Sequence, residues 1–346
     1  MKSISIYLSI LMSIFIFSAC EKEIEFNGKI TDPLIVVNSY LNPDSIVSAQ
    51  ISESRFFLKD SITFKNISNA EVAVWVNGDF KEKMSYDEKG IYNGTFKPLI
   101  GDTLKLVVNV PGFKEVTSQT VIYYQPVINS IDTTNVWTGM SYQISYSGSS
   151  SNGGPTIWKN DTIATVMGHT INYTLKFKDN GNEQNYYRLI VKSTSYYVQT
   201  DTVTQVETKS EKDSYFYYFS DVVSGDNTNT DPLSIVGGMY SYNMYGVFSD
   251  ELFNGKTYSL TFSTNEDVYT YRSEYDYGRK TPDRKKVSIY LQSISKDYYQ
   301  YAQSRVAAET GDNFFSEQVQ IHNNIVGGIG ILGSYTASEV YQIDLQ

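Results

Sequence analysis

The stretch that decides the fold is Glu71-Val72-Ala73-Val74-Trp75-Val76-Asn77-Gly78-Asp79. Its apolar residues, rich in β-branched types, are typical of a strand. The run stops at Asn77-Gly78, a pair in which both residues tolerate a positive φ. Because Asn-Gly beside a strand-like run is the strongest short-range hairpin signal, we predict two antiparallel strands joined by a tight turn here.

Further strand-like runs flank this hairpin on both sides. They lie at 34–37, 47–51, 91–96, 103–108 and 117–123. Short strands at this spacing predict a small β-sandwich of the immunoglobulin type over residues 33–125. The order NAEVAVWVNGD, GIYNGTF, GDTLKLVVNVPGF also resembles the carboxypeptidase-regulatory and transthyretin-like modules.

Strand-like runs continue beyond Gln125-Pro126-Val127, where proline suggests a domain boundary. They lie at 141–146, 170–177, 186–193 and 258–263. A single helix is predicted over 295–309, with Ser295 as its N-cap and Gly311 as its stop. The predicted fold is therefore all-β: the N-terminal sandwich, then a larger β-rich domain over 126–346 with one helix near the C-terminus.

Composition excludes several classes of function. The chain has 346 residues with 28 basic and 38 acidic side chains, a formal charge of −10. Phosphate backbones repel such a chain, so no nucleic-acid partner is expected. One cysteine and two histidines leave little material for a metal centre or a thiolate mechanism. We therefore predict no catalytic residues, no metal and no cofactor.

The N-terminus predicts where the protein is located. Lys2 precedes an apolar run from Ile4 to Phe17, too short for a membrane span and typical of a signal peptide. The run ends at Ser18-Ala19-Cys20, which resembles a bacterial lipoprotein signal. We predict a signal peptide over 1–19, lipidation of Cys20 and a membrane anchor. The alternative is an uncleaved anchor, or a buried free thiol. Acidic residues within the tether, 20–32, fit equally a cell-surface export signal and a solvated tether.

Two possible catalytic groups have simpler interpretations. His169 follows Gly168 and is expected at a turn, as a solvated or capping side chain. Asp250 precedes Glu251 at what looks like a short helical turn, where solvated carboxylates are expected. No Gly-x-Ser-x-Gly motif occurs. These residues therefore give no reason to expect an enzyme.

Tyrosine is the informative residue type, because 30 are present and many fall between 215 and 277. Tyrosine is enriched at interfaces, since its ring is large and rigid and its tip is polar. One hypothesis is an aromatic binding surface; the other is sheet packing with ordinary exposed rings. The candidate residues of that surface are Tyr215, Tyr217, Tyr218, Tyr240, Tyr242, Tyr245, Tyr269 and Tyr271.

The closing segment carries a family resemblance. Residues 314–331 read FFSEQVQIHNNIVGGIGI, and Asp297-Tyr298-Tyr299 precedes them. This ending resembles that of a Bacteroidota outer-membrane lipoprotein family with a domain of unknown function. Asn185-Tyr186-Tyr187-Arg188-Leu189 and Leu34-Ile35-Val36-Val37-Asn38 resemble other stretches of that family.

Genes of the family that this chain resembles typically lie beside genes for TonB-dependent receptors. The resemblance therefore implies a non-catalytic accessory subunit, a lid or a ligand-capturing protein, of a TonB-dependent import complex. Its partner would be the β-barrel receptor, and its ligand is not indicated. The alternative function is a surface adhesin or structural lipoprotein.

Overall fold

The computed structural model describes residues 32–55, 65–148, 157–200, 206–215, 218–219, 221–224, 245–266, 268–271, 282, 284–310 and 319–345. The chain divides into two compact units. The first, Met1–Pro33 with Arg55–Ser61, lies almost wholly outside the described residues, and with it the predicted signal peptide, Cys20 and most of the tether. The second, Leu34–Ser54 with Ile62–Gln346, contains the elements described below.

Strands from the N-terminal part form a sandwich. One sheet has the order β5-β4-β8-β9 and contains the predicted hairpin. Asn77 and Gly78 form its turn with φ of 54° and 94°, so the Asn-Gly prediction is confirmed. The bounds are β4 Glu71–Val76, β5 Asp79–Lys83, β8 Thr103–Asn109 and β9 Val116–Val121.

The facing layer of this sandwich belongs to a larger sheet. Its N-terminal strands are β1 Ile35–Leu41, β2 Ser48–Glu53, β3 Lys65–Asn66, β6 Ser85–Tyr86 and β7 Ile91–Asn93, with the short 3-10 helix η1 Glu88–Gly90 before β7. Alternate residues of β1 and β8 point inward, and the core between the layers includes Val37, Ile51, Val74, Tyr92 and Leu106. The burial of these apolar side chains holds the two layers together.

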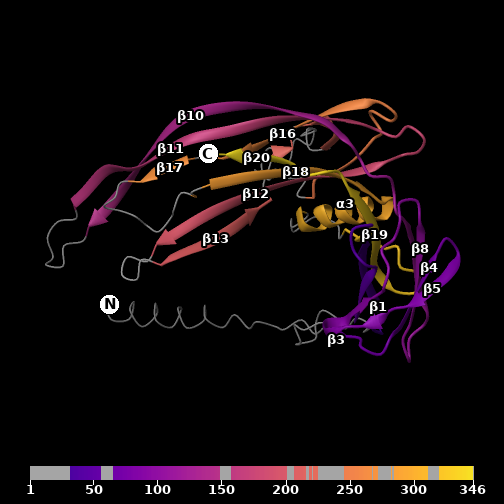
Figure 1. Cartoon of the computed structure of the whole chain (residues 1–346). Coiled ribbons are helices and arrows are strands. Elements are labelled where there is room, and N and C mark those ends of the chain that lie inside the picture. The colour runs from indigo at the N-terminus through magenta and orange to yellow at the C-terminus, as the bar shows by residue number, and fades with distance from the viewer. Residues whose placement is uncertain are drawn as a thin grey trace, which may run out of the picture. The chain divides into compact units, whose positions relative to one another are not determined.

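A second sandwich follows along the chain. Its upper sheet in Figure 1 has the order β10-β11-β16-β14, with β17 paired to β11. The bounds are β10 Ile128–Gly148, β11 Ile157–Lys178, β14 Tyr218–Phe219, β16 Thr257–Asn265 and β17 Val268–Tyr271. Its other sheet consists of β12 Tyr186–Thr200, β13 Glu207–Ser214, β15 Val247–Ser249, β18 Arg284–Ile294 and β20 Tyr341–Leu345, and η2 Val222–Ser224 is a short 3-10 helix.

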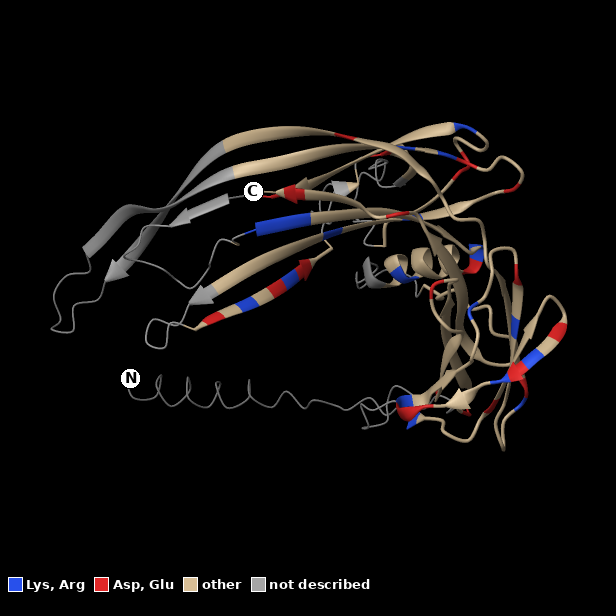
Figure 2. Cartoon of the chain, in the orientation of Figure 1, with Lys and Arg blue, Asp and Glu red and all other residues tan. Residues whose placement is uncertain are grey.

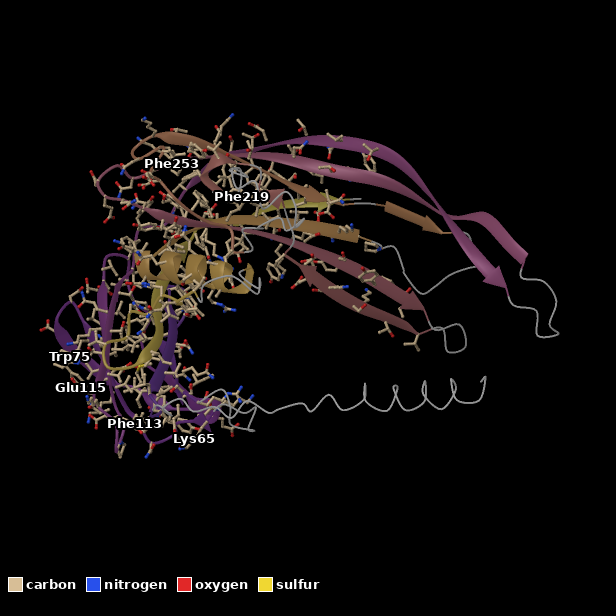
Figure 3. The ribbon with its side chains drawn as sticks, turned by 180° about the vertical axis from the view of Figure 1, so that it is seen from behind. Lys65, Trp75, Phe113, Glu115, Phe219 and Phe253 are labelled. Atoms are coloured by element: carbon tan, nitrogen blue, oxygen red, sulfur yellow. The ribbon has the colours of Figure 1, made fainter. Side chains whose placement is uncertain are left out.

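Aromatic residues fill the core of the second sandwich. Phe177 contacts Tyr187 and Phe253 edge to face, with ring centroids 5.1 and 5.6 Å apart. The ring centroids of Phe219, in β14, and Phe248, in β15, are 5.7 Å apart, and this contact joins the two layers. In Figure 3, Phe219 and Phe253 lie in this sandwich, while Trp75 and Phe113 lie in the first. Much of the tyrosine and phenylalanine content therefore serves packing.

The two sandwiches share one sheet. Strand β19, Ile329–Ala337, pairs with β18 at one end and runs parallel to β1, so that Val36 faces Ile329 and Leu41 faces Ser334. The ladder therefore continues from β12 through β18 and β19 into β1 and β2. The C-terminal part of the chain completes the N-terminal sandwich. The predicted division between residues 33–125 and 126–346 stays a prediction.

The helix begins where the sequence predicts. Helix α3 spans Lys296–Thr310, and the Ser295 hydroxyl accepts a hydrogen bond from the Tyr298 amide at 3.3 Å. This contact confirms Ser295 as the N-cap. Within the described part of the chain α3 is the one α-helix, so the prediction of an all-β chain with one helix near its C-terminus is confirmed.

Candidate functional site

The outer face of strands β12 and β18 presents an aromatic–arginine cluster beside α3. We define it as Arg188, Tyr245, Tyr298, Arg305 and Tyr40, extended by Tyr290 and Tyr215. Leu189 and Val191 point to the core, so alternation places Arg188, Ile190 and Lys192 on the opposite face. Tyr290 faces Ile190 across the ladder and lies on that same face.

Arg188 is the centre of the cluster. Its Nε donates to the carbonyl oxygen of Tyr245 at 3.0 Å, and its Nη1 donates to the Tyr298 hydroxyl at 2.7 Å. Both acceptors are neutral oxygens, so these bonds orient the guanidinium without neutralising it. The guanidinium carbon also lies 5.9 Å from the centre of the Tyr298 ring. Arg188 therefore joins a strand, a loop and a helix.

Further rings extend the cluster around α3. The ring of Tyr40, on β1, is 4.8 Å from that of Tyr298. Arg305, on α3, lies over the Tyr245 ring at 5.6 Å. Cations over tyrosine faces are attracted by the ring quadrupole. Tyr40 is 39% exposed, so part of this surface is available to another molecule.

Tyr290 interacts electrostatically with both Arg188 and Tyr215. Burial raises the pKa of Tyr290, Tyr215 raises it further, and Arg188 and Lys192 lower it. Burial also raises the pKa of Tyr298, against the effect of Arg188. Both hydroxyls thus remain protonated near neutral pH and can donate hydrogen bonds. The Nζ of Lys192 lies 2.8 Å from Oδ2 of Asp213, and this contact lowers the pKa of Asp213.

Two of the predicted aromatic residues, Tyr215 and Tyr245, belong to this cluster, each through different neighbours. Tyr215 is 60% exposed and close enough to Tyr290 and Lys192 to affect their pKa values. Tyr245 contacts Arg188 and Arg305. The side chains of Tyr218, Tyr269 and Tyr271 are outside the described set, although all three belong to strands. Tyr217, Tyr240 and Tyr242 lie outside the described residues.

Sequence reasoning missed most of this cluster. Arg188 appears in the sequence analysis only as part of a family-like stretch, and Tyr40 and Tyr290 were not singled out. A signal existed for Arg188, because an arginine within the apolar run 186–191 needs an acceptor or a partner. Tyr40 had none, since its proximity to α3 depends on β19 lying between β1 and β18.

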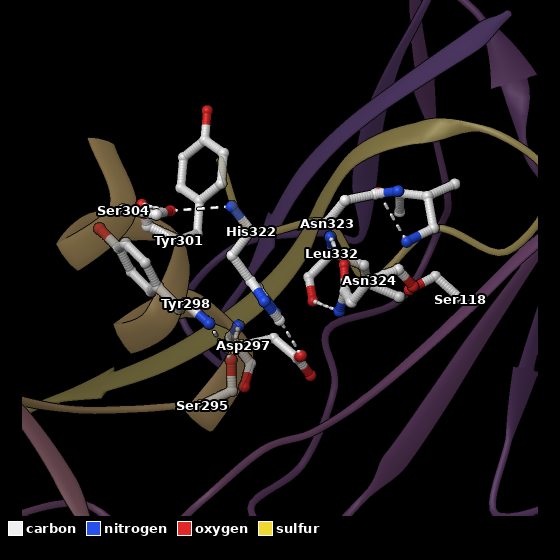
Figure 4. Close-up of polar contacts among 12 residues, drawn as sticks. Ser118, Ser295, Asp297, Tyr298, Tyr301, Ser304, His322, Asn323, Asn324 and Leu332 are labelled. Atoms are coloured by element: carbon white, nitrogen blue, oxygen red, sulfur yellow. Dashed lines mark hydrogen bonds and ion pairs between the residues drawn. The ribbon is translucent and has the colours of Figure 1, made fainter. Parts of the chain in front are cut away.

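Two of the family-like stretches meet beside the cluster. The Nε2 of His322 lies 2.8 Å from Oδ1 of Asp297, in the first turn of α3, and the His322 amide donates to Ser304 (Figure 4). Asn324 exchanges two hydrogen bonds with the backbone of Leu332, each 2.9 Å long. These contacts fasten the segment before β19 to the helix and to its own strand, which indicates a structural role.

Two interpretations of polar residues were wrong. His169 lies within β11 rather than at a turn; it is 9% exposed, stacks on Trp137 at 3.8 Å, and its Nε2 is 3.0 Å from Oδ1 of Asn135. Strand β11 simply continues through Gly168 because β10 and β16 pair with it.

Asp250 is 0% exposed, not solvated, because its turn packs against the segment at Asn185 and leads into the core residue Phe253. Its Oδ2 accepts a hydrogen bond from the Asn185 amide at 2.9 Å, and among described groups its Oδ1 has no partner. Burial raises the pKa of this carboxyl. The hydrogen bond from the Asn185 amide lowers the pKa, and the nearby charge of Asp179 raises it. Asp179 accepts hydrogen bonds from Tyr187 and the Gly255 amide, so these acids organise the loops at this end of the sandwich.

No group of three or more histidine, cysteine or acidic side chains suited to a metal ion occurs among the described residues. No described helix combines the length and the apolar character needed to cross a membrane.

The described residues form two β-sandwiches that share one sheet. A family profile described as a domain of unknown function, DUF4249, matches residues 21–340. The chain therefore belongs to the DUF4249 family. No curated protein matches.

Solved structures give only remote likenesses. A Corynebacterium diphtheriae protein described as membrane anchored is 10% identical with a TM-score of 0.18, and the match covers 89% of this chain and 59% of that one. This chain thus spans 59% of the length of that protein. A structure of carbohydrate-binding modules from the β-sandwich superfamily is 8% identical with a TM-score of 0.18, covering 70% of this chain and 96% of that one.

Proposed function

We propose that this protein is a lipid-anchored, non-catalytic accessory subunit of an outer-membrane import complex, and that it docks onto a TonB-dependent β-barrel through the aromatic–arginine cluster. The single observation that carries the proposal is the cluster itself. Arg188, oriented by Tyr245 and Tyr298, lies on a face that also presents the exposed ring of Tyr215.

The chemistry of the cluster favours a protein partner. Tyrosine and arginine dominate the residues that contribute most to protein–protein binding, because they offer large rigid contact areas and several hydrogen-bond donors. Half-exposed rings already packed against guanidinium groups lose little conformational freedom on binding. A surface of this kind suits a docking subunit, whether it acts as a lid or as a ligand-capturing protein.

The N-terminal sequence supports the location. Cys20 ends a signal-like segment, and the family match begins at residue 21, where the chain would continue after the lipidated cysteine. Two or more acyl chains would hold the protein stably at a membrane. A membrane anchor also raises the effective concentration of the cluster near a barrel in the same membrane.

The test is a mild-detergent pull-down of the tagged full chain from outer membranes, with mass spectrometry of the eluate. We expect a stoichiometric TonB-dependent barrel with the parent chain. Tyr215→Ala combined with Tyr40→Ala should reduce its recovery, whereas Tyr341→Ala should not, although Tyr341 is also 41% exposed. Recovery of the lipoprotein alone, with abundant barrel in the input, would contradict the proposal and favour the surface adhesin.

A further inference from the structure

Strand β10 leaves a long free edge. It spans Ile128–Gly148 at one end of the sheet order β10-β11-β16-β14, and among described strands it pairs only with β11. One side of the strand bonds to β11, so alternate peptide groups on the other side point away from the sheet. Such a row of donors and acceptors is a template for a further strand.

This edge lacks the usual protection against pairing. Natural edge strands are protected by charged side chains, proline, bulges or short length. Asp132 is the single charged residue of β10, and it is paired with Lys176 of β11 at 3.0 Å. No charged residue follows until Lys159. The register with β11 is uninterrupted from Ser130 to Tyr142, and its two irregularities lie outside this stretch, between Ile128 and Ser130 and between Tyr142 and Gln143.

The other described edges are protected in different ways. Strand β13 is charged along its length, and Figure 2 shows it banded in red and blue, whereas the part of β10 that is not grey there is almost wholly tan. Strand β5 carries Asp79, Lys81, Glu82 and Lys83. Strand β9 is uncharged but covered, because Thr117 forms a bridge with Val326. Strands β6 and β14 have two residues each, and β20 is short and carries Asp344. Among these edges, β10 is the long one that carries a single charged residue.

Exposed apolar side chains accompany the open edge. Val136 is 45% exposed and Trp137 is 54% exposed, on opposite faces of β10. Trp137 is held in place, since it stacks on His169 with an angle of 4° between the ring planes. A rigid, half-exposed tryptophan next to unpaired backbone groups has the composition of an interface.

We propose that the free edge of β10 pairs with β10 of a second copy of this chain, antiparallel across a two-fold axis, to form one continuous sheet. The occupant follows from charge. The chain carries a net charge of −10, which opposes self-association through most surfaces. Pairing through residues 133–142, where the register with β11 is regular, places uncharged segments opposite each other, so like charges do not meet there.

The test measures the mass of the full chain by sedimentation equilibrium in density-matched detergent. We expect a dimer. Thr134→Lys with Thr138→Lys should weaken it by at least about a hundredfold, because the two-fold axis doubles each introduced charge. Both threonines are exposed and lie on the face away from the core, since Ile131 is the buried residue of the opposite register. Thr208→Lys with Ser210→Lys, on the charged β13 edge, adds the same charge and should leave the dimer intact.

Amide hydrogen exchange distinguishes loss of the dimer from loss of folding in the lysine variant. Peptides covering β10 should become more protected as parent concentration rises, while the lysine variant keeps the protection of its core strands and loses this concentration dependence. A monomer at all concentrations, a dimer unaffected by lysine at 134 and 138, or stoichiometric pairing of β10 with another protein would each overturn the proposal.

Discussion

Gly330 of β19 lies against the backbone of Val37 in β1. A Cβ atom placed on Gly330 would be 2.1 Å from the Val37 carbonyl oxygen, and Gly330 has a φ of 121°. The parallel pairing of β19 with β1 therefore requires glycine here, both for close approach and for backbone conformation. This contact is where the C-terminal part of the chain completes the N-terminal sandwich.

Gly330→Ala should lower the free energy of unfolding by about 3 kcal/mol or more, because a clash with backbone adds to the strain of a positive φ. Chemical denaturation would measure the change. Gly101→Ala is the matched control, since Gly101 has a φ of 91° but nothing within 4 Å of its Cβ position. If the two variants lost equal stability, the close approach to Val37 would not matter.

Ser334→Ala tests the hydrogen bonds that join β19 to β9. The buried Ser334 hydroxyl donates to the Val121 carbonyl at 2.5 Å and accepts from Thr120 at 3.2 Å. Removing it leaves a buried carbonyl without this donor, so we expect a loss of about 1–3 kcal/mol in the free energy of unfolding. Ser210→Ala, on the exposed strand β13, should stay within about 0.5 kcal/mol of the parent. A Ser334→Ala variant as stable as Ser210→Ala would refute the assignment.

Arg188→Lys should lower stability by about 1–2 kcal/mol although it retains the charge. Lysine has a single terminal nitrogen and cannot bond both the Tyr245 carbonyl and the Tyr298 hydroxyl with the fixed geometry of a guanidinium. Thermal and urea unfolding would measure the loss. Arg284→Lys is the comparison, because Arg284 is exposed and pairs with Asp344 at the surface. Equal effects would mean that the guanidinium geometry at 188 contributes nothing particular.

Asp250→Asn should change how stability depends on pH. Burial raises the pKa of Asp250 above its ordinary 3.8, so in the window above that value the folded state binds more protons than the unfolded state. The contribution of Asp250 to stability is therefore present at low pH and lost as pH rises through the raised pKa. Unfolding measured from about pH 4 to pH 7 should show Asp250→Asn gaining stability relative to the parent as pH increases. A constant difference across this range would contradict a raised pKa.

Local patterns predicted the local elements well. Asn77-Gly78 forms its turn, Ser295 caps α3, and the alternating runs became strands, because each signal depends on neighbouring residues. The same reasoning failed at His169 and Asp250. His169 became part of a long strand through pairing with β10, and Asp250 was buried against the segment at Asn185. Both outcomes depend on residues distant in sequence.

The sequence alone determined that this chain is a β-rich protein with one C-terminal helix, because strand alternation, turns and helix caps depend on neighbouring residues. The sequence also predicts a lipidated anchor at Cys20. Only the tertiary structure decided that β19 inserts beside β1, that Tyr40 meets Tyr298 and Arg188, and that β10 keeps a free edge. Strand order and edge exposure follow from which distant strands pair, and the period-two pattern of a strand specifies its faces but not its neighbours.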